Sequence, residues 1–400
     1  MQNSQLEKNI SKVYLIRFFA MFMVLMPVIV PFFQSVGIGM EGVYILQSVF
    51  AVTVFICEIP SGYISDLLGR KKTLIVAFFL KGLGFSLFPF AQDLSLLIIA
   101  EIILGFSVSL FSGTDTAIIY DTLEAMGSKK AQIKILGKSI SAGTFGEACA
   151  SLIASLLMLV SFNPYQLSII SAIFSWISFF IAFSIIEPPR LKMNNTHKEN
   201  FKYIYRGLFK QSTLMNLILL NTIFYFSSTL FAVWMFQKYW ENIHIPLVYF
   251  GFLWGIYNLV VSICSRYAYK IEKHLGSSVT LILIGLFPIA GYFGISFIDH
   301  FLGVVICLSF QVCRGLGQVI LKDALNKRVT ADFRATANSI SQMGVRILFT
   351  IIGPIIGVLI DKKGLSDTTL IMAIFYCIVF VAVMIPLVLQ RKNFMQISKA

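Results

Sequence analysis

The chain has 400 residues, of which 57% are apolar and 13% are charged, and its formal net charge is +13. A soluble globular protein has roughly 25% charged residues, so this excess of apolar surface requires a lipid solvent. The positive charge does not indicate a nucleic-acid-binding protein, because the basic residues form short clusters between apolar runs rather than one basic face.

The first long apolar run, from about residue 13 to 36, predicts a membrane span. It is too long for the core of a signal peptide and has no A-x-A-like cleavage site. Eleven further runs are also long enough, because a hydrocarbon core about 30 Å thick needs about 20 mainly apolar residues per helix. Their expected limits are 42–65, 72–90, 94–120, 133–160, 164–186, 213–236, 246–269, 277–297, 300–321, 334–360 and 367–390.

The distribution of lysine and arginine supports an even number of spans. With the N-terminus inside, 25 of the 32 basic residues fall in inner segments, and the outer loops carry only Lys238, Lys362 and Lys363. Cytoplasmic loops accumulate basic residues in this way. We therefore expect both termini to be cytoplasmic, and we expect the membrane to be a bacterial inner membrane.

A basic interruption at the midpoint, residues 188–212, predicts a linker between two six-helix halves, 1–187 and 213–400. An internal repeat supports the division. Asp121 follows Gly113 by eight residues at the end of span four, and Asp323 follows Gly315 by the same spacing at the end of span ten. Parallel repeats of six spans are one way in which transporters are built.

The inner turn between spans two and three reads GYISDLLGRKKT, residues 62–73. The preference for basic residues in cytoplasmic loops explains the bases of this turn, but it does not explain its acid or its glycines. The glycines permit a tight turn and close backbone approach. The turn resembles the G-x-x-x-D-x-x-G-R-K/R motif of the major facilitator superfamily. The matching residues are Gly62, Asp66, Gly69, Arg70 and Lys71.

The resemblance implies an all-α integral membrane fold of twelve transmembrane helices in two pseudo-symmetric six-helix bundles. It also implies that Asp66 and Arg70 latch the cytoplasmic side by docking on the entrance of span eleven, near Arg334. Three positions depart from patterns common in the family. Leu67 directly follows Asp66, where the family usually has a base. Glu101 occupies a span that often carries an arginine, and Glu147 stands about where proton-coupled drug antiporters have a proline.

Ionisable side chains inside the spans cost free energy, about 2.5 to 3.5 kcal/mol each at the bilayer centre, so they suggest a use. Glu101 and Asp115 follow helical spacing along span four, and Glu147 lies on a face of span five that is rich in small residues. Glu147, then Asp115, with Glu101, are the candidates for proton coupling. Glu58 and Lys81 favour structural ion pairs instead.

Polar and aromatic side chains in both halves predict a solute site of mixed charge. An apolar pocket with a few polar anchors is typical of organic ligands. Aromatic residues near span ends also fit an interfacial belt, which leaves both interpretations open. The candidates are Arg17, Arg314, Arg346, Gln311, Asn338, Gln342, Asn221, Tyr225, Trp254, Tyr257 and Asn258.

Other motifs carry little chemistry. GIGMEG, residues 37–42, satisfies G-x-G-x-x-G but joins two spans rather than a strand and a helix. The six cysteines lack metal-ligand spacing, and the sequence contains no Walker A, H-E-x-x-H or G-x-S-x-G pattern. We therefore expect no metal, no cofactor and no enzymatic activity.

Together these features predict a monomeric secondary transporter that works by alternating access. The first hypothesis is proton-coupled export of an amphipathic organic compound, such as a drug, siderophore or metabolite. The alternative is import of an organic ion or metabolite by a symporter or facilitator. A channel or membrane receptor is the alternative outside transport, and no nucleic-acid partner is expected.

Overall fold

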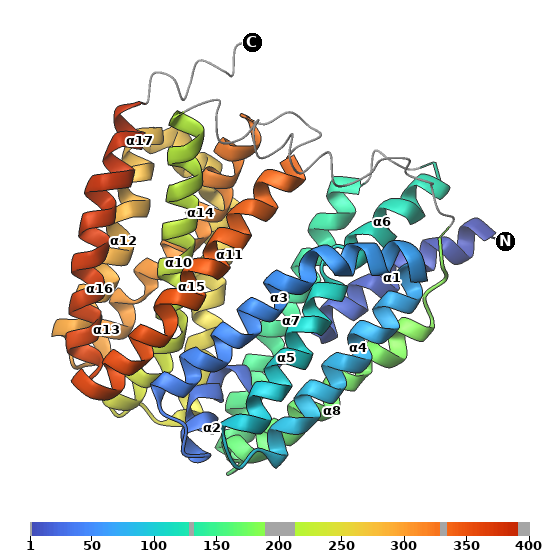
Figure 1. Ribbon diagram of the computed structural model, residues 1–400, viewed down its shortest axis with the longest axis horizontal. Helices are drawn as coiled ribbons and strands as arrows, with labels where there is room; N and C mark the ends of the chain where they lie inside the picture. The colour runs from blue at the N-terminus through green and yellow to red at the C-terminus, as the bar shows by residue number, and fades with distance from the viewer. Residues whose placement is uncertain (1, 128–131, 189–212, 329–333, 391–400) are drawn as a thin grey trace. The chain divides into compact units, whose positions relative to one another are not determined.

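The computed structural model describes residues 2–127, 132–188, 213–328 and 334–390, and within these ranges every regular element is a helix (Figure 1). A bilayer favours this outcome, because the hydrocarbon contains no water and a helix satisfies its backbone hydrogen bonds internally. Eleven helical segments in the described ranges are long and apolar enough to cross a membrane. They match the eleven spans expected after the first, so the predicted fold class is confirmed. Of the predicted linker, residues 188–212, all but Pro188 lies outside the described residues.

The chain divides into two compact units, of which the first comprises Met1–Met193 and Pro246–Gly255. Its helix α5 packs against α3 and α4, α4 also packs against α8, and α1 packs against α7 and α8. The buried core between these helices is aliphatic and aromatic. The elements are α1 (Gln2–Ala20), η1 (Met26–Val28), α2 (Ile29–Ser35), α3 (Met40–Leu68), α4 (Arg70–Leu87), η2 (Phe88–Phe90), α5 (Leu94–Phe111), α6 (Thr114–Ala125), α7 (Gln132–Leu159) and α8 (Pro164–Phe183).

The first expected span is an interrupted helix. Helix α1 ends at Ala20, and helical structure resumes only with η1 at Met26, followed by α2. Pro27 contributes to the break, because it has no N–H to donate to the carbonyl oxygen of Met23, four residues earlier. The expectation of one continuous helix over residues 13–36 is therefore wrong at its centre.

Two buried side chains satisfy backbone groups at this break. The Lys81 ammonium donates hydrogen bonds to the carbonyl oxygens of Phe19 and Ala20, the last residues of α1. The Ser171 hydroxyl of α8 accepts a hydrogen bond from the Leu25 N–H at 2.7 Å. Non-helical backbone at membrane depth is tolerated where neighbouring helices supply such partners.

The fourth expected span is also interrupted. Helix α5 ends at Phe111 and α6 begins at Thr114, and Gly113 between them has φ +88°. Glycine adopts this left-handed conformation at no steric cost. Glu101 and Asp115 therefore belong to two different helices, and the expectation that they share one helical face is wrong.

The two sequence ends of the first six spans lie side by side. The Asn9 amide nitrogen donates to the Ile186 carbonyl at 2.8 Å, and its amide oxygen accepts from the Ile186 N–H at 3.0 Å. Lys12 donates to the Ser184 carbonyl nearby. Asn9 is fully buried, and this reciprocal pairing fixes the segment after α8 on α1.

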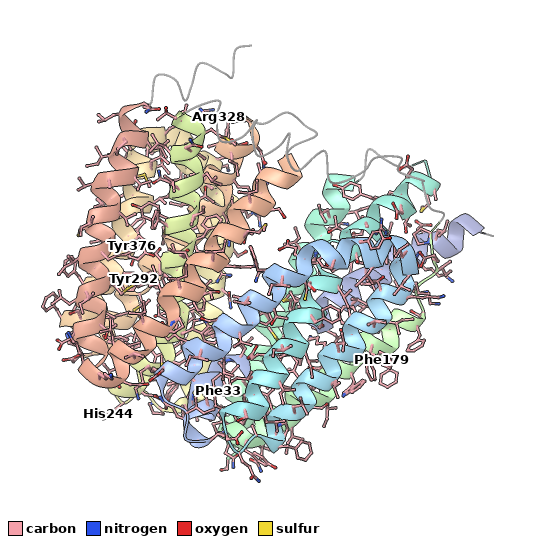
Figure 2. All side chains as sticks on the ribbon, viewed as in Figure 1. Phe33, Phe179, His244, Tyr292, Arg328 and Tyr376 are labelled. Carbon is pink, nitrogen blue, oxygen red and sulfur yellow. The ribbon has the colours of Figure 1, made fainter. Side chains whose placement is uncertain are left out.

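The second unit comprises Asn194–Ile245 and Ile256–Ala400. Its core holds a stacked pair of tyrosines, Tyr292 and Tyr376, with ring centroids 5.5 Å apart (Figure 2). Their hydroxyls donate to the carbonyls of Ser228 at 2.7 Å and Phe224 at 3.2 Å. The remaining elements of the chain are α10 (Thr213–Asn242), η4 (Leu247–Tyr249), α11 (Phe250–Leu275), α12 (Ser277–Phe297), α13 (Phe301–Ile306), α14 (Leu308–Asn326), α15 (Arg334–Lys363), α16 (Leu365–Val379), the π-helical turn η6 (Phe380–Met384) and α17 (Ile385–Leu389).

Helices α1 and α7 approach closely at a glycine. A Cβ atom added to Gly146 would lie 2.3 Å from the carbonyl oxygen of Phe18, whereas one added to Gly137, on the same helix, would meet nothing within 4 Å. Small residues at membrane helix interfaces permit this approach.

We expect Gly146→Ala to lower the thermal unfolding temperature in detergent, since α1 and α7 must separate to admit the methyl group. Overpacking of this kind costs roughly 1 to 3 kcal/mol. Gly137→Ala is the matched control and should be neutral or stabilising, because alanine favours helix by about 1 kcal/mol over glycine. Equal unfolding temperatures for the two variants would contradict the close contact.

Candidate functional site

An ion pair joins the two interrupted helices inside the first unit. The guanidinium Nε of Arg17, in the last turn of α1, contacts the carboxylate Oδ2 of Asp115, in the first turn of α6. Asp115 is fully buried, and the other oxygen of its carboxylate accepts a hydrogen bond from the Thr116 N–H at 2.7 Å. The sequence named both charged residues as candidates, and the fold brings them together.

The position of each charge suits the helix end that carries it. An acid near a helix N-terminus and a base near a C-terminus are stabilised by the helix dipole. Asp115 lies at the N-terminus of α6, and Arg17 lies near the C-terminus of α1, where Lys81 also binds the terminal carbonyls. The Arg17 guanidinium carbon is 5.2 Å from the centre of the Phe111 ring, a cation–π contact that covers part of the charge.

Glu101 is buried at a separate place in the same unit. Its carboxylate accepts a hydrogen bond from the Gln47 side chain of α3 at 3.3 Å. This carboxylate therefore lies between α5 and α3, whereas Asp115 contacts α1. The structure does not join the two acids in one cluster.

Glu147 bonds to Trp254 within the first unit, which includes the first residues of α11. The Trp254 indole Nε1 donates to the Glu147 carboxylate at 3.0 Å. Two further contacts tie the same helices. The Phe252 N–H donates to the Ser155 hydroxyl at 3.0 Å, and a Cβ atom on Gly251 would collide with the backbone of α7. Two residues that the sequence proposed separately thus form one contact.

Several candidates of the second unit lie in its packed interior. The Asn221 amide donates to the Val383 carbonyl in η6 at 3.0 Å, and Tyr225 is fully buried on the next turn of α10. The Tyr257 hydroxyl donates to the Val304 carbonyl of α13 at 2.8 Å. These contacts join helices of one unit, so their role in solute binding stays a prediction.

The other candidates differ in exposure. The Asn338 amide donates to the Asn326 side chain at 2.7 Å, and Gln311 of α14 is buried. Gln342 is exposed, and three residues are partly exposed, namely Asn258, Arg314 and Arg346. The described contacts do not gather these residues into one cluster.

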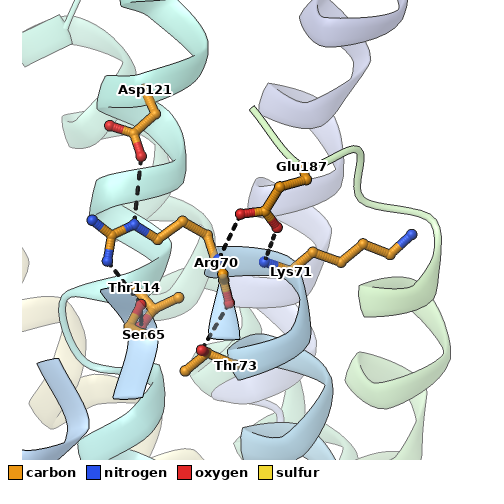
Figure 3. A network of polar contacts seen from close by, with 8 residues as sticks. Ser65, Arg70, Lys71, Thr73, Thr114, Asp121 and Glu187 are labelled. Atoms are coloured by element: carbon orange, nitrogen blue, oxygen red, sulfur yellow. Dashed lines mark hydrogen bonds and ion pairs between the residues drawn. The ribbon is translucent and has the colours of Figure 1, made fainter. Parts of the chain in front are cut away.

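The cytoplasmic motif forms a polar network within its own unit (Figure 3). Gly69, with φ +97°, ends α3 and directly precedes α4. The Arg70 guanidinium donates to Ser65 Oγ at 2.8 Å and contacts Asp121 Oδ2 at 3.4 Å. Lys71 contributes its backbone N–H, and Gly62 is exposed on α3.

A carboxylate covers the N-terminus of α4 in this network. The two Glu187 oxygens accept hydrogen bonds from the N–H groups of Arg70 at 2.8 Å and Lys71 at 2.7 Å (Figure 3). Exposed N–H groups and the helix dipole make a helix N-terminus a favourable place for an anion. These contacts do not test the predicted latch between the motif and the entrance of span eleven. The structure describes Asp66 and Arg334 as helical backbone, their side chains lie outside its described part, and the latch stays a prediction.

Sequence reasoning gave no role to several side chains that complete these contacts, and four of them lie beside charged candidates. Asp121 was visible as the repeat counterpart of Asp323, and its spacing was the available signal. The other three are Gln47, Phe111 and Glu187. Their partners lie on distant helices, and periodicity along one helix does not reveal which other helix it faces.

The fold and its buried charges define an α-helical integral membrane protein with the architecture of a transporter. The chain belongs to the Major Facilitator Superfamily, whose sequence profile matches residues 13–347.

Similar proteins agree with this assignment. The chain is 22% identical to the uncharacterized MFS-type transporter MJ1560 of Methanocaldococcus jannaschii, a match that covers 94% of this chain and 97% of the relative. It is 23% identical to the uncharacterized MFS-type transporter YxaM of Bacillus subtilis, over 89% of this chain and 90% of that one. The crystal structure of the nucleoside transporter NupG superposes with a TM-score of 0.76 at 13% identity, covering 98% of this chain and 99% of the other, which shows a shared fold.

We expect Asp115→Asn to destabilise the protein strongly, because it leaves the Arg17 guanidinium without a counter-ion. Removing one partner of a buried ion pair costs about 3 to 5 kcal/mol. Thermal unfolding in detergent measures the loss, and the double variant Arg17→Met with Asp115→Leu should recover part of it.

The matched control is Asp323→Asn, which breaks the Lys327–Asp323 pair of 2.6 Å whose side chains are 62% and 53% exposed. An exposed pair contributes about 1 kcal/mol or less. If both single variants unfold at the wild-type temperature, the Arg17–Asp115 pair makes no such contribution.

Proposed function

We propose that this protein is a secondary transporter that couples movement of an organic solute to protons by alternating access. The observation that carries the proposal is the Arg17–Asp115 pair at the ends of two interrupted helices, in which Asp115 is buried and Arg17 is partly exposed. In transporters, interrupted helices are a common source of solute and ion sites. An intramembrane ion pair of this kind is a functional-site hypothesis by default.

Proton transfer would act on the pair directly. A proton added to the Asp115 carboxylate removes its negative charge, so the attraction to Arg17 is lost. The guanidinium, still positive and lying against Phe111, then needs another acceptor. An oxygen of the solute would supply that acceptor, which links proton binding to solute binding at one place.

Glu147 is the second proposed proton site, and it was the first that the sequence favoured. Its carboxylate accepts from the Trp254 indole at 3.0 Å, on the contact between α7 and α11. Protonation weakens this bond, because a neutral carboxyl is a poorer acceptor than a carboxylate. The state of Glu147 would thereby control the contact of α7 with the first residues of α11, which belong to the same unit.

Export of an amphipathic compound, such as a drug, siderophore or metabolite, is the first direction to test, and import is the alternative. Fold likeness does not fix direction. We place the protein in a bacterial inner membrane as a monomer with both termini cytoplasmic, in keeping with its distribution of basic residues. The polar candidates of the second unit, Arg314 and Arg346 among them, are also proposed to bind the solute.

The test is flux in proteoliposomes of known orientation across an imposed pH gradient, screened over a panel of organic compounds. Coupled transport predicts solute accumulation that a protonophore abolishes, and the gradient that drives it gives the direction. Flux that does not saturate with solute would indicate a channel. Absence of flux for every compound, with binding alone, would favour a receptor.

We expect Glu147→Gln to flatten the pH dependence of flux while solute exchange continues. Glutamine keeps the size of the side chain and an acceptor for Trp254, but it cannot take up a proton as a carboxylate does. Initial rates at pH values from about 5 to 8 measure the effect. Glu241→Gln, near the end of α10 beside Lys238, is the control and should keep the wild-type profile. An unchanged profile for Glu147→Gln would leave Asp115 as the proton site.

A further inference from the structure

Helix α11 exposes a continuous stripe along one face. Its members recur at intervals of three and four residues, as expected for one side of a helix. The first part is apolar and the last part is basic. The apolar members are Ile256, Leu259 and Ile263, exposed by 49%, 58% and 48%, and the exposed basic members are Arg266, Lys270 and Lys273.

The basic end of the stripe has an aromatic support. The Tyr267 ring lies 6.0 Å from the Arg266 guanidinium carbon and 5.4 Å from the Lys270 ammonium. Cation–π contacts of this kind hold cations next to an aromatic face. Glu272 is the acid of this turn, and its carboxylate accepts from the Ser277 hydroxyl at 2.8 Å, at the start of α12.

The stripe matches one bilayer leaflet in length. From Ile256 to Arg266 the helix rises by about 15 Å at roughly 1.5 Å per residue. Half of a hydrocarbon core about 30 Å thick has the same depth. The basic residues then lie where lipid headgroups begin, on the side that the distribution of lysine and arginine assigns to the cytoplasm.

We propose that this stripe binds one anionic phospholipid. Its phosphate contacts Arg266 and Lys270, and an acyl chain lies along Leu259 and Ile263. Basic side chains at the inner membrane surface attract anionic headgroups. The Tyr267 ring lies beside both cations, on the helix rather than in a loop. Neither the fold nor proton coupling requires this lipid, so the proposal is independent of the transport mechanism.

The test is titration of the purified full chain with phosphatidylglycerol, followed by native mass spectrometry of the bound lipid. The double variant Arg266→Gln with Lys270→Gln should bind it about thirtyfold more weakly. The matched control, Lys362→Gln with Lys363→Gln, removes the same charge from the last turn of α15 and should bind as the wild type does. Equal affinity in the double variant and the control would overturn the proposal.

Two further measurements distinguish binding of a whole anionic phospholipid from binding of its headgroup alone. Phosphatidylcholine should bind more weakly than phosphatidylglycerol, because it carries no net negative charge. Glycerol 3-phosphate at the same concentration should not displace the lipid, because it lacks the chain that packs on the apolar stripe. Displacement of the lipid by glycerol 3-phosphate would show that the site recognises a free phosphate group, and it would overturn the proposal of a lipid site. The targeted side chains are exposed, and the single variant Lys270→Gln should give an intermediate affinity if the double variant is poorly folded.

Discussion

The constraint on which this structure depends is that the bilayer interior offers no water to an unpaired backbone group. Every described span is helical for this reason, and a break in a helix requires a substitute partner. The break after α1 has two such partners, Lys81 on its last carbonyls and Ser171 on the Leu25 N–H. A lysine at this depth is thus explained by backbone chemistry rather than by a carboxylate partner.

The two breaks have an electrostatic result. Each exposes one helix end to the interior of the first unit, and each end carries the charge that its dipole favours, Arg17 on α1 and Asp115 on α6. Their ion pair holds the broken ends together. A buried pair adds little stability over apolar residues of equal size. We infer that this pair is kept for a charge that changes, which is the basis of the proposed coupling.

The spans were predictable because a helix that crosses lipid must be mainly apolar, and apolar runs can be found directly in the sequence. The breaks were partly predictable, since Pro27 and Gly113 are the residues that such geometry requires. Contacts between side chains of different helices were much less predictable. Glu147 and Trp254 were both named as candidates, but their mutual contact depends on how α7 and α11 are rotated against each other, and hydrophobic period does not fix that rotation. The contact of Glu101 with Gln47 could not be predicted for the same reason, because it depends on how α5 is rotated against α3.

The position of Glu187 gives the first unit a mechanical property. This residue directly precedes the central basic segment of the chain, and its carboxylate is fastened to the first two amides of α4. One residue earlier, Ile186 is fastened to Asn9 of α1. Two consecutive residues after α8 are therefore bound to two different helices, α1 and α4. The last residues before that segment are thus held by the same turn that carries Arg70.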